Sequence, residues 1–273
     1  MKLVSFSTSD GIVRPGALRE DSVIDLSSSY ADTLAVITAG FATPPAAPAF
    51  PLAKVKLHAP LHNPPRIFAI GLNYHDHAVE SKMEAPKVPV VFFKLHTAII
   101  GPDDPIVLPA ASNEPDYEAE FAVVIGRGGY RIPAAAWRRH IYGYTMLNDV
   151  SARDVQFATS QWSLAKSFNT FCPLGPAIVT ADEIADPHAL GIRLTIDGET
   201  LQNSNTRELI FKIPDLIEYL SSIAPLLPGD IISTGTPGGV GLGRTPKRWL
   251  KPGDTVTVSV DGLGSLTNPV VAE

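Results

Sequence analysis

The segment DYEAEFAVVIG, residues 116–126, predicts both a strand of the fold and a candidate site. Its second half, FAVVIG, is a run of apolar and β-branched residues that is typical of a buried strand. Side chains alternate along a strand with a period of two, so extending the strand backwards places Asp116, Glu118 and Glu120 on one face. Like charges on one strand face repel each other, and either solvent or a bound cation must offset that repulsion. The spacing alone leaves both explanations open.

A further carboxylate lies in the segment YGYTMLNDVSARDVQ, residues 142–156. Asp149 follows an apolar, strand-like run and precedes a candidate helix. A carboxylate at such a junction can cap the helix, a task for which Ser151 competes, or it can join Glu118 and Glu120 as a metal ligand. Three carboxylates without a cysteine favour Mg²⁺ or Mn²⁺, allow Ca²⁺ and disfavour Zn²⁺.

Strand signals extend outward from these segments in both directions. The first 30 residues contain KLVSF, GIVRPGALRE and SVIDLS, which glycine and polar turn signals separate. The segments IRLTID, residues 192–197, and TVTVSV, residues 255–260, alternate apolar and polar side chains, and the Asp-Gly pairs at 197–198 and 261–262 are hairpin turn signals. With 25 prolines and 21 glycines, the chain has the composition of a turn-rich, mainly β protein with some α.

Helical segments are few in the prediction. We expect helices within residues 31–40, 151–160 and 214–223, the last of which opens with a proline and places apolar residues on one face. The segment ATPPAAPAFP, residues 42–51, has the composition of a linker. We therefore predict a small N-terminal domain at residues 1–60 and a larger domain at residues 61–273.

Composition excludes several classes of function. The net charge of −6 and the absence of a basic cluster argue against a nucleic-acid partner. The single cysteine, Cys172, forbids an intrachain disulfide and a cysteine-based zinc site. No run of 18 apolar residues and no signal peptide occurs, so we expect a cytoplasmic protein without a membrane partner. The glycine-rich run at 235–243 lacks the phosphate-loop ending and the dinucleotide spacing, so neither ATP nor a dinucleotide is expected as cofactor.

Seven motifs occur in order from about residue 65 to the end of the chain. They are GLNYHDHAVE, DYEAEFAVVIG, NDVSARDVQ, LAKSFNTFCPLGP, LQNSNT, PGDIISTGTPGGVG and LKPGDTVTVSVDGLGSLTN. Together they resemble the fumarylacetoacetate hydrolase family, especially its bacterial and fungal single-function branch of acylpyruvate and diketo-acid hydrolases. The resemblance implies a mixed β-sandwich roll after a small N-terminal domain, and a homodimer. It also implies Mg²⁺, Mn²⁺ or Ca²⁺ held by Glu118, Glu120 and Asp149.

The resemblance assigns roles to three catalytic candidates. His77 and Glu80 match a pair on a mobile lid that activates water, and positions three apart lie on one face of a helix. Lys166, in LAKSF, matches a lysine that steadies an enolate.

Three further residues match the substrate-binding positions of the family. Arg153 and Gln156, in SARDVQ, match residues that hold the carboxylate or oxo groups of the substrate, and Thr236 matches a residue that lines the same pocket. Many single-function members read KSFDTF where this chain reads KSFNTF, so Asn169 removes a negative charge that we expect near the pocket.

The main functional hypothesis is an enzyme that hydrolyses a C–C bond of an acylpyruvate-like or 2,4-diketo acid through a metal-stabilised enolate. Coordination of the oxo oxygen gives the electron pair of the broken bond a stable place, and Lys166 adds a second positive contact. The expected substrate is a small anionic 2-oxo or diketo acid. Two alternatives stay open: an oxaloacetate-type decarboxylase or a 2-oxo acid isomerase or hydratase on the same fold, and a non-catalytic ligand-binding protein.

Overall fold

The computed structural model describes residues 1–40 and 47–273 and has the predicted mainly β architecture with some helix. The larger of its sheets has twelve strands. Ten of them follow the order β4-β3-β2-β1-β14-β12-β11-β17-β6-β7, while β5 pairs with β1 and β8 pairs with β14. The bounds of these strands are β1 Lys2–Ser7, β2 Arg14–Arg19, β3 Ser22–Asp25, β4 Ala49–Pro51, β5 Lys56–His58, β6 Ile67–Gly71, β7 Val90–Lys94, β8 Ile99–Ile100, β11 Ala119–Ile125, β12 Ile141–Asn148, β14 Cys172–Thr180 and β17 Ile231–Ser233.

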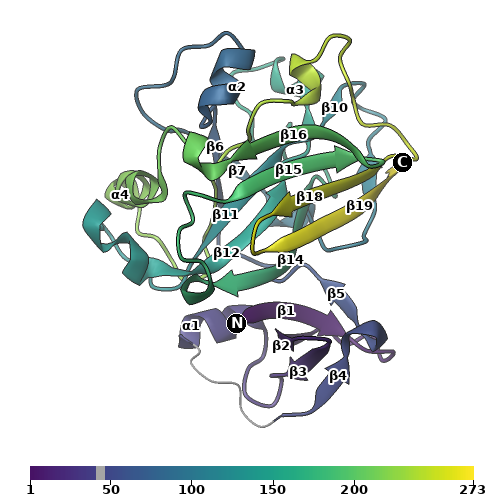
Figure 1. The fold of residues 1–273 in the computed structure, drawn as a ribbon, viewed down its shortest axis with the longest axis vertical. Helices are drawn as coiled ribbons and strands as arrows, with labels where there is room; N and C mark the ends of the chain where they lie inside the picture. Colours follow the sequence, from purple (N-terminus) through teal and green to yellow (C-terminus); the bar gives the residue numbers. More distant parts are fainter. Residues whose placement is uncertain (41–46) are drawn as a thin grey trace.

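A second sheet of five strands crosses the centre of the large one and lies in front of β11 and β12 in Figure 1. Its order is β16-β15-β18-β19-β9, and a separate pair, β10 with β13, lies at the upper end of the molecule. The strands are β9 Ile106–Leu108, β10 Pro115–Asp116, β13 Ser151–Ala152, β15 Gly191–Ile196, β16 Glu199–Asn205, β18 Thr255–Val260 and β19 Gly264–Ala272. Both large sheets contain parallel and antiparallel pairs, so the sheets are mixed.

Burial of strand β11 on both faces explains why its sequence is apolar after Glu120. Phe121 and Val123 point into a core that they share with Leu194 of the second sheet. Ala122 and Val124 point the opposite way, into a core formed with the N-terminal part of the chain. Both faces of the strand are therefore buried, and each large apolar side chain there contributes roughly 1.5–3 kcal/mol relative to exposure.

The predicted hairpins are confirmed. Strands β15 and β16 flank Asp197-Gly198, and strands β18 and β19 flank the turn that begins at Asp261-Gly262. Asp197 and Gly198 both have positive φ, at 51° and 84°. This combination is the backbone form that a two-residue turn requires to match the strand twist, and it favours an Asp-Gly pair.

Two of the three predicted helices are confirmed. Helix α1, Thr33–Ala39, begins after Asp32, whose side chain accepts a hydrogen bond from the Ala35 N–H. Helix α4, Ile213–Ile223, has its proline in the first turn. Helix α2 spans His75–Glu80.

The predicted helix at 151–160 is wrong over most of its length. Ser151 and Ala152 form strand β13, which pairs with β10, and only the single turn α3, Arg153–Gln156, is helical. After this turn the chain enters the connection to Phe171, which carries Lys166 to the candidate site. The tertiary pairing of β13 with β10 overrides the weak helical preference of the segment.

The predicted linker at 42–51 lies partly outside the described residues, which resume at residue 47. Ala49–Pro51 forms strand β4, so the linker prediction is wrong for these three residues. Within residues 1–40 and 47–273, strand β4 is at the end of the strand order and pairs with β3 alone. An edge strand tolerates a proline because one row of its backbone groups makes no ladder bonds.

Residues 1–40 and 47–58 occupy the lower part of the molecule in Figure 1, but their strands are not a separate sheet. Strand β1 pairs with β14 through Lys2 with Val179 and Leu3 with Ile178, so the large sheet runs on into the N-terminal part. The domain boundary near residue 60 stays a prediction. In the described part of the chain, no helix combines the length and the apolar character needed to cross a membrane.

Candidate functional site

The structure brings the carboxylates of Glu118, Glu120 and Asp149 together in a buried cluster. One carboxylate oxygen from each lies within 4.8 Å of the others. Glu120 is on β11, Glu118 immediately precedes this strand, and Asp149 follows the neighbouring strand β12. The Asp149 N–H donates to the Glu118 carbonyl at 2.8 Å, which fixes the two side chains beside each other. Asp149 does not cap a helix, because Ala152 precedes α3 and no side chain caps it.

Asp116 does not share the face of Glu118 and Glu120, so that part of the strand prediction is wrong. Strand β10 ends at Asp116 and β11 begins only at Ala119, so the alternation is interrupted. Asp116 instead accepts hydrogen bonds from the backbone N–H groups of Gly241 at 2.7 Å and Leu242 at 3.0 Å. It also accepts a bond from Arg153 Nε at 2.8 Å and thereby holds that guanidinium beside the cluster.

Two cations bind the Glu118 side chain. Arg153 donates to its Oε1 at 2.5 Å and Lys166 donates to its Oε2 at 2.6 Å. Burial alone would raise the pKa of Glu118, but the charges of Arg153 and Lys166 outweigh burial and hold the pKa well below its usual range. Glu118 is therefore ionised, as a metal ligand must be.

Lys166 also donates to Asp149 Oδ2 at 2.8 Å, so it bridges two of the three carboxylates. Burial lowers the pKa of Lys166, but the charges of Asp149 and Glu118 raise it by more than burial lowers it. The net shift is therefore upward. The side chain stays an ammonium and can place a fixed positive charge in the site.

Glu120 differs from the other two carboxylates because no lysine or arginine within residues 1–40 and 47–273 forms an ion pair with it. Its Oε2 accepts hydrogen bonds from Ser233 Oγ and from the Gly235 N–H. Burial raises the pKa of Glu120, and the charges of Asp149 and Glu118 raise it further. A buried carboxylate without a cation is costly, and a divalent ion among three oxygen ligands would remove that cost. The donor set therefore fits Mg²⁺ or Mn²⁺.

Sequence reasoning missed Lys94, the last residue of β7. Its ammonium donates to Asp149 Oδ1 at 2.6 Å and also to the Lys166 carbonyl oxygen, and its side chain is fully buried. The signal was present in the sequence, since VVFFK places a lysine at the end of an apolar strand, and buried lysines are almost always paired.

The connection that carries Lys166 is fastened along the edge of β7. The Phe93 N–H donates to Ser163 Oγ at 3.3 Å and the Leu95 N–H donates to Ser167 Oγ at 3.0 Å. These bonds occupy backbone donors that an edge strand would otherwise expose. Together with the contact from Lys94 to the Lys166 carbonyl, they fix the position of Lys166.

His77 and Glu80 lie on helix α2, as predicted, with 3.4 Å between His77 Nδ1 and Glu80 Oε2. Both Glu80 oxygens accept a bond from the Gly239 N–H at 3.0 Å. Burial raises the pKa of Glu80, but the hydrogen bonds from His77 and Gly239 lower it more strongly, and the net shift is downward. His75, on the same helix, is exposed.

A pocket of about 160 Å³, which we call the carboxylate pocket, brings most of the predicted site residues together. Its polar lining is His77, Ser81, Glu118, Glu120, Arg153, Gln156, Lys166 and Thr236, and its apolar lining includes Ile70, Leu72, Met83, Phe92, Phe157, Trp162 and Leu242.

Gln156 and Thr236 are held within this pocket by polar contacts. Arg153 donates to Gln156 Oε1 at 2.8 Å, and Gln202 Nε2 donates to Thr236 Oγ1 at 2.8 Å. The sequence analysis did not identify Gln202, which also accepts a bond from the Ala119 N–H and so anchors the start of β11. Asn169 does not line the pocket and is exposed, so its expected place near the pocket is wrong.

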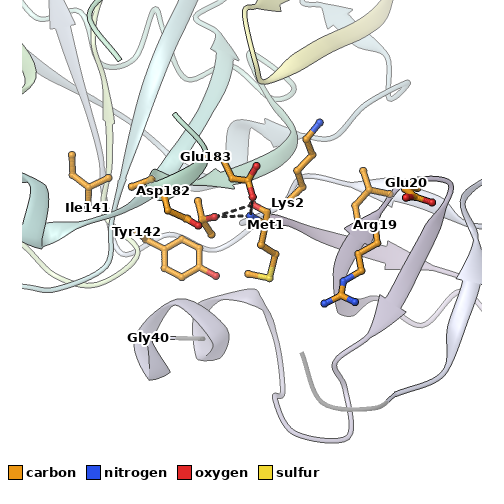
Figure 2. A pocket seen from close by; sticks show the side chains of 12 residues that line it. Met1, Lys2, Arg19, Glu20, Gly40, Ile141, Tyr142, Asp182 and Glu183 are labelled. Atoms are coloured by element: carbon orange, nitrogen blue, oxygen red, sulfur yellow. Dashed lines mark hydrogen bonds and ion pairs between the residues drawn. The ribbon is translucent and has the colours of Figure 1, made fainter. Parts of the chain in front are cut away.

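A larger cavity of about 770 Å³ lies away from these residues, between strands β1 and β2 and the segment that follows β14. Figure 2 shows Met1 beside Glu183, with Tyr142 on one side of Met1 and Arg19 and Glu20 on the other. The Met1 ammonium donates to Glu183 Oε1 and to Thr180 Oγ1, both at 2.7 Å. None of the three clustered carboxylates lines this cavity.

The fold and the site together define a class of proteins. Residues 66–271 match the model of the C-terminal domain of fumarylacetoacetate (FAA) hydrolase. The chain belongs to the fumarylacetoacetate hydrolase family, and the predicted family and fold are confirmed.

Individual relatives are named for several reactions. The mitochondrial oxaloacetate tautomerase of Xenopus laevis is 49% identical over 219 residues, which are 80% of this chain and 69% of that protein. A solved structure of 5-carboxymethyl-2-hydroxymuconate delta-isomerase from Mycobacterium smegmatis is 40% identical, with a TM-score of 0.85 and complete coverage of both chains. Maleylpyruvate hydrolase from Sphingobium sp. SYK-6, solved with manganese(II) and pyruvate, is 31% identical, with a TM-score of 0.83 and coverage of 100% of this chain and 99% of that one.

Proposed function

We propose that this chain is a metal-dependent enzyme that interconverts the keto and enol forms of oxaloacetate or a closely related 2-oxo acid. The observation that carries this proposal is a cluster of three buried carboxylates, two of which line one small pocket together with Lys166 and His77. Several relatives at 46–49% identity are named oxaloacetate tautomerases, which supports the isomerase alternative of the sequence analysis over the hydrolase hypothesis.

Glu118, Glu120 and Asp149 would hold Mg²⁺ or Mn²⁺, with Ca²⁺ as a further candidate. When bound, the cation would attract the negative charge that develops on the 2-oxo oxygen. Lys166, already fixed beside the same carboxylates, places a second positive charge there. Arg153 and Gln156 line the pocket and offer donors to a substrate carboxylate, a contact that stays a prediction.

The reaction needs a group that moves a proton at C3 of the acid. In the keto-to-enol direction a proton leaves C3, the electron pair forms the C2–C3 double bond, and the oxo oxygen gains a proton. His77 lines the pocket and is the candidate base. Glu80 faces its Nδ1, which favours the tautomer that carries a proton on Nδ1 and leaves Nε2 free to accept one.

The test is the absorbance of enol-oxaloacetate after mixing with purified protein and Mg²⁺ or Mn²⁺. We expect the wild-type chain to accelerate the approach to the keto–enol equilibrium, and His77→Asn to lose most of the acceleration while it still binds the metal. A matched control is His75→Asn, because His75 is exposed on the same helix. Equal rates for the wild type and His77→Asn would refute the role of His77.

The second candidate function is the hydrolysis of an acylpyruvate or 2,4-diketo acid. The His77–Glu80 pair could serve a water nucleophile instead of C3, and the maleylpyruvate hydrolase among the structural neighbours supports this reading. Loss of diketo absorbance together with formation of pyruvate would favour it over tautomerisation. Failure of both reactions across a panel of 2-oxo acids would favour the non-catalytic alternative.

We also propose that the chain forms a homodimer. Phe93 and Leu95 lie on either side of Lys94, the last residue of edge strand β7, and are 45% and 49% exposed. Leu164 on the adjoining connection is 74% exposed. Such a group of exposed apolar side chains suits an interface between copies. Light scattering should give twice the chain mass for the wild type, and Phe93→Asp should lower the measured mass toward that of one chain.

A cytoplasmic location and the absence of a nucleic-acid partner stay predictions.

A further inference from the structure

We propose that Trp162 sets the size of the acid that the carboxylate pocket accepts, and so restricts the substrate to 2-oxo acids with a small substituent on C3. This inference rests on the proposed function, because it takes the 2-oxo acid to bind with its reacting end at the carboxylates. The class that fits is a four-carbon 2-oxo diacid or an acid of similar size, and longer 2,4-dioxo acids are excluded.

The pocket is divided into a polar and an apolar end. His77, Lys166 and two of the clustered carboxylates, Glu118 and Glu120, form the polar end. The proposed function places the reacting oxo acid group there. Phe92 and Trp162 form an aromatic wall, with their ring centroids 5.6 Å apart and an interplanar angle of 67°. The Lys166 ammonium lies 5.1 Å from the centre of the Phe92 ring, so the wall begins directly beside the cationic group.

The indole of Trp162 packs directly on the backbone of Gly71, the last residue of β6. A Cβ atom at this position would lie only 2.5 Å from Cζ3 of the indole. Gly71 is therefore the residue that lets the indole reach this depth. The close contact leaves the ring no room to retreat toward β6 when a larger ligand enters.

The connection that carries Trp162 is fastened just after the indole. Ser163 accepts a bond from the Phe93 N–H, and Ser167 accepts one from the Leu95 N–H. These two bonds hold the connection against β7 on the C-terminal side of Trp162, and Gly71 limits the indole on the side of β6. The wall is thus held in place, as a limit on ligand size requires.

The volume of the pocket agrees with this limit. Its 160 Å³ is well below the roughly 300–1,000 Å³ that is typical of sites for drug-sized ligands. A longer acyl substituent would have to displace the indole, whereas a substituent no larger than a carboxylate would not.

The experiment compares wild type, Trp162→Ala and Trp162→Phe on a series of acids. Turnover of oxaloacetate and of 2,4-dioxo acids with increasing acyl length is measured as kcat/KM with Mn²⁺. We expect Trp162→Ala to raise the ratio of long-acid to oxaloacetate kcat/KM by about tenfold or more, and Trp162→Phe to raise it less. The matched control is Trp137→Phe, which removes an indole that does not line the pocket and should leave the ratio unchanged.

A binding measurement separates this inference from the proposed function. Calorimetric titration of the Mn²⁺-loaded proteins with oxalate and with a long 2,4-dioxo acid needs no turnover. Preference of the wild type for oxalate, reduced in Trp162→Ala, supports the size limit even if oxaloacetate is not converted. An unchanged ratio in both Trp162 variants, or an equal loss on all acids, overturns the size limit even if oxaloacetate is converted. Trp162→Phe keeps the test decisive if Trp162→Ala fails to fold, which circular dichroism would show.

Discussion

Replacing Lys94 by methionine tests whether the carboxylate cluster depends on a cation that lies behind it. The Lys94 and Asp149 side chains are both fully buried, and 2.6 Å separates Lys94 Nζ from Asp149 Oδ1. Methionine keeps most of the volume of the lysine side chain, but it removes the positive charge and the hydrogen-bond donor to the Lys166 carbonyl. Removal of one partner of a buried ion pair typically costs about 3–5 kcal/mol. Because Asp149 keeps its bond to Lys166, we expect about 3 kcal/mol, at the lower end of this range.

For a chain of this size, such a loss corresponds to a decrease of roughly 6–12 °C in the melting temperature. The assay is thermal unfolding followed by circular dichroism, with a chelator present so that bound metal does not mask the loss. The control is Lys54→Met, because Lys54 is exposed and should change the free energy of unfolding by less than about 0.5 kcal/mol. A Lys94→Met variant as stable as this control would refute the view that Lys94 supports the cluster.

Two further predictions concern the position of Arg153 and the Glu80 carboxylate on helix α2. Asp116→Asn should weaken the bond that holds Arg153 and lower kcat/KM for oxaloacetate roughly 10–100-fold, which is the usual effect of losing a residue that orients a site. A loss in kcat/KM below threefold would contradict this role of Asp116. The pKa of Glu80 is lowered in the folded chain, so its ionised form stabilises the fold above its ordinary pKa of 4.5, and this contribution is lost as the pH falls through the lowered value. Glu80→Gln should therefore be destabilised relative to wild type at pH 7 and less so at pH 3, as paired thermal melts would show; a difference independent of pH would contradict it.

The sequence predicts those parts of the fold that local pattern determines. The apolar run at 121–125 forms a strand that is buried on both faces, and the two Asp-Gly pairs form the turns of the hairpins. In each case, the residues that determine the structure are neighbours in the sequence.

Predictions fail where residues far apart in the sequence decide the structure. Asp116 leaves the face of Glu118 because backbone N–H groups from residues 241 and 242 and the side chain of Arg153 bind it. Lys94 belongs to an apolar strand whose outer edge is covered by the connection that precedes Phe171, and nothing near Lys94 in the sequence indicates that cover. The exposure of Asn169 follows from the same connection.

The reaction was less predictable than the site. Glu118, Glu120 and Asp149 would serve hydrolysis, decarboxylation and tautomerisation alike, since each reaction develops negative charge on the same oxo oxygen. The three residues therefore indicate a shared chemical step and leave the overall reaction open. The names of the relatives at 46–49% identity, and not the geometry, move the proposal from hydrolysis toward tautomerisation.

The central claim is that Glu118, Glu120 and Asp149 bind a divalent cation on which the conversion of a 2-oxo acid depends. The most direct test is calorimetric titration of Mn²⁺ into the wild type and into Glu120→Gln, with the enol–keto rate of oxaloacetate measured on the same samples. We predict one bound Mn²⁺ per chain in the wild type, and the loss of both Mn²⁺ binding and rate acceleration in Glu120→Gln. We expect this variant to keep its fold, because Glu120 forms no ion pair with any lysine or arginine in the described part of the chain. Acceleration that survives in Glu120→Gln, or in the wild type with excess chelator, would contradict the claim.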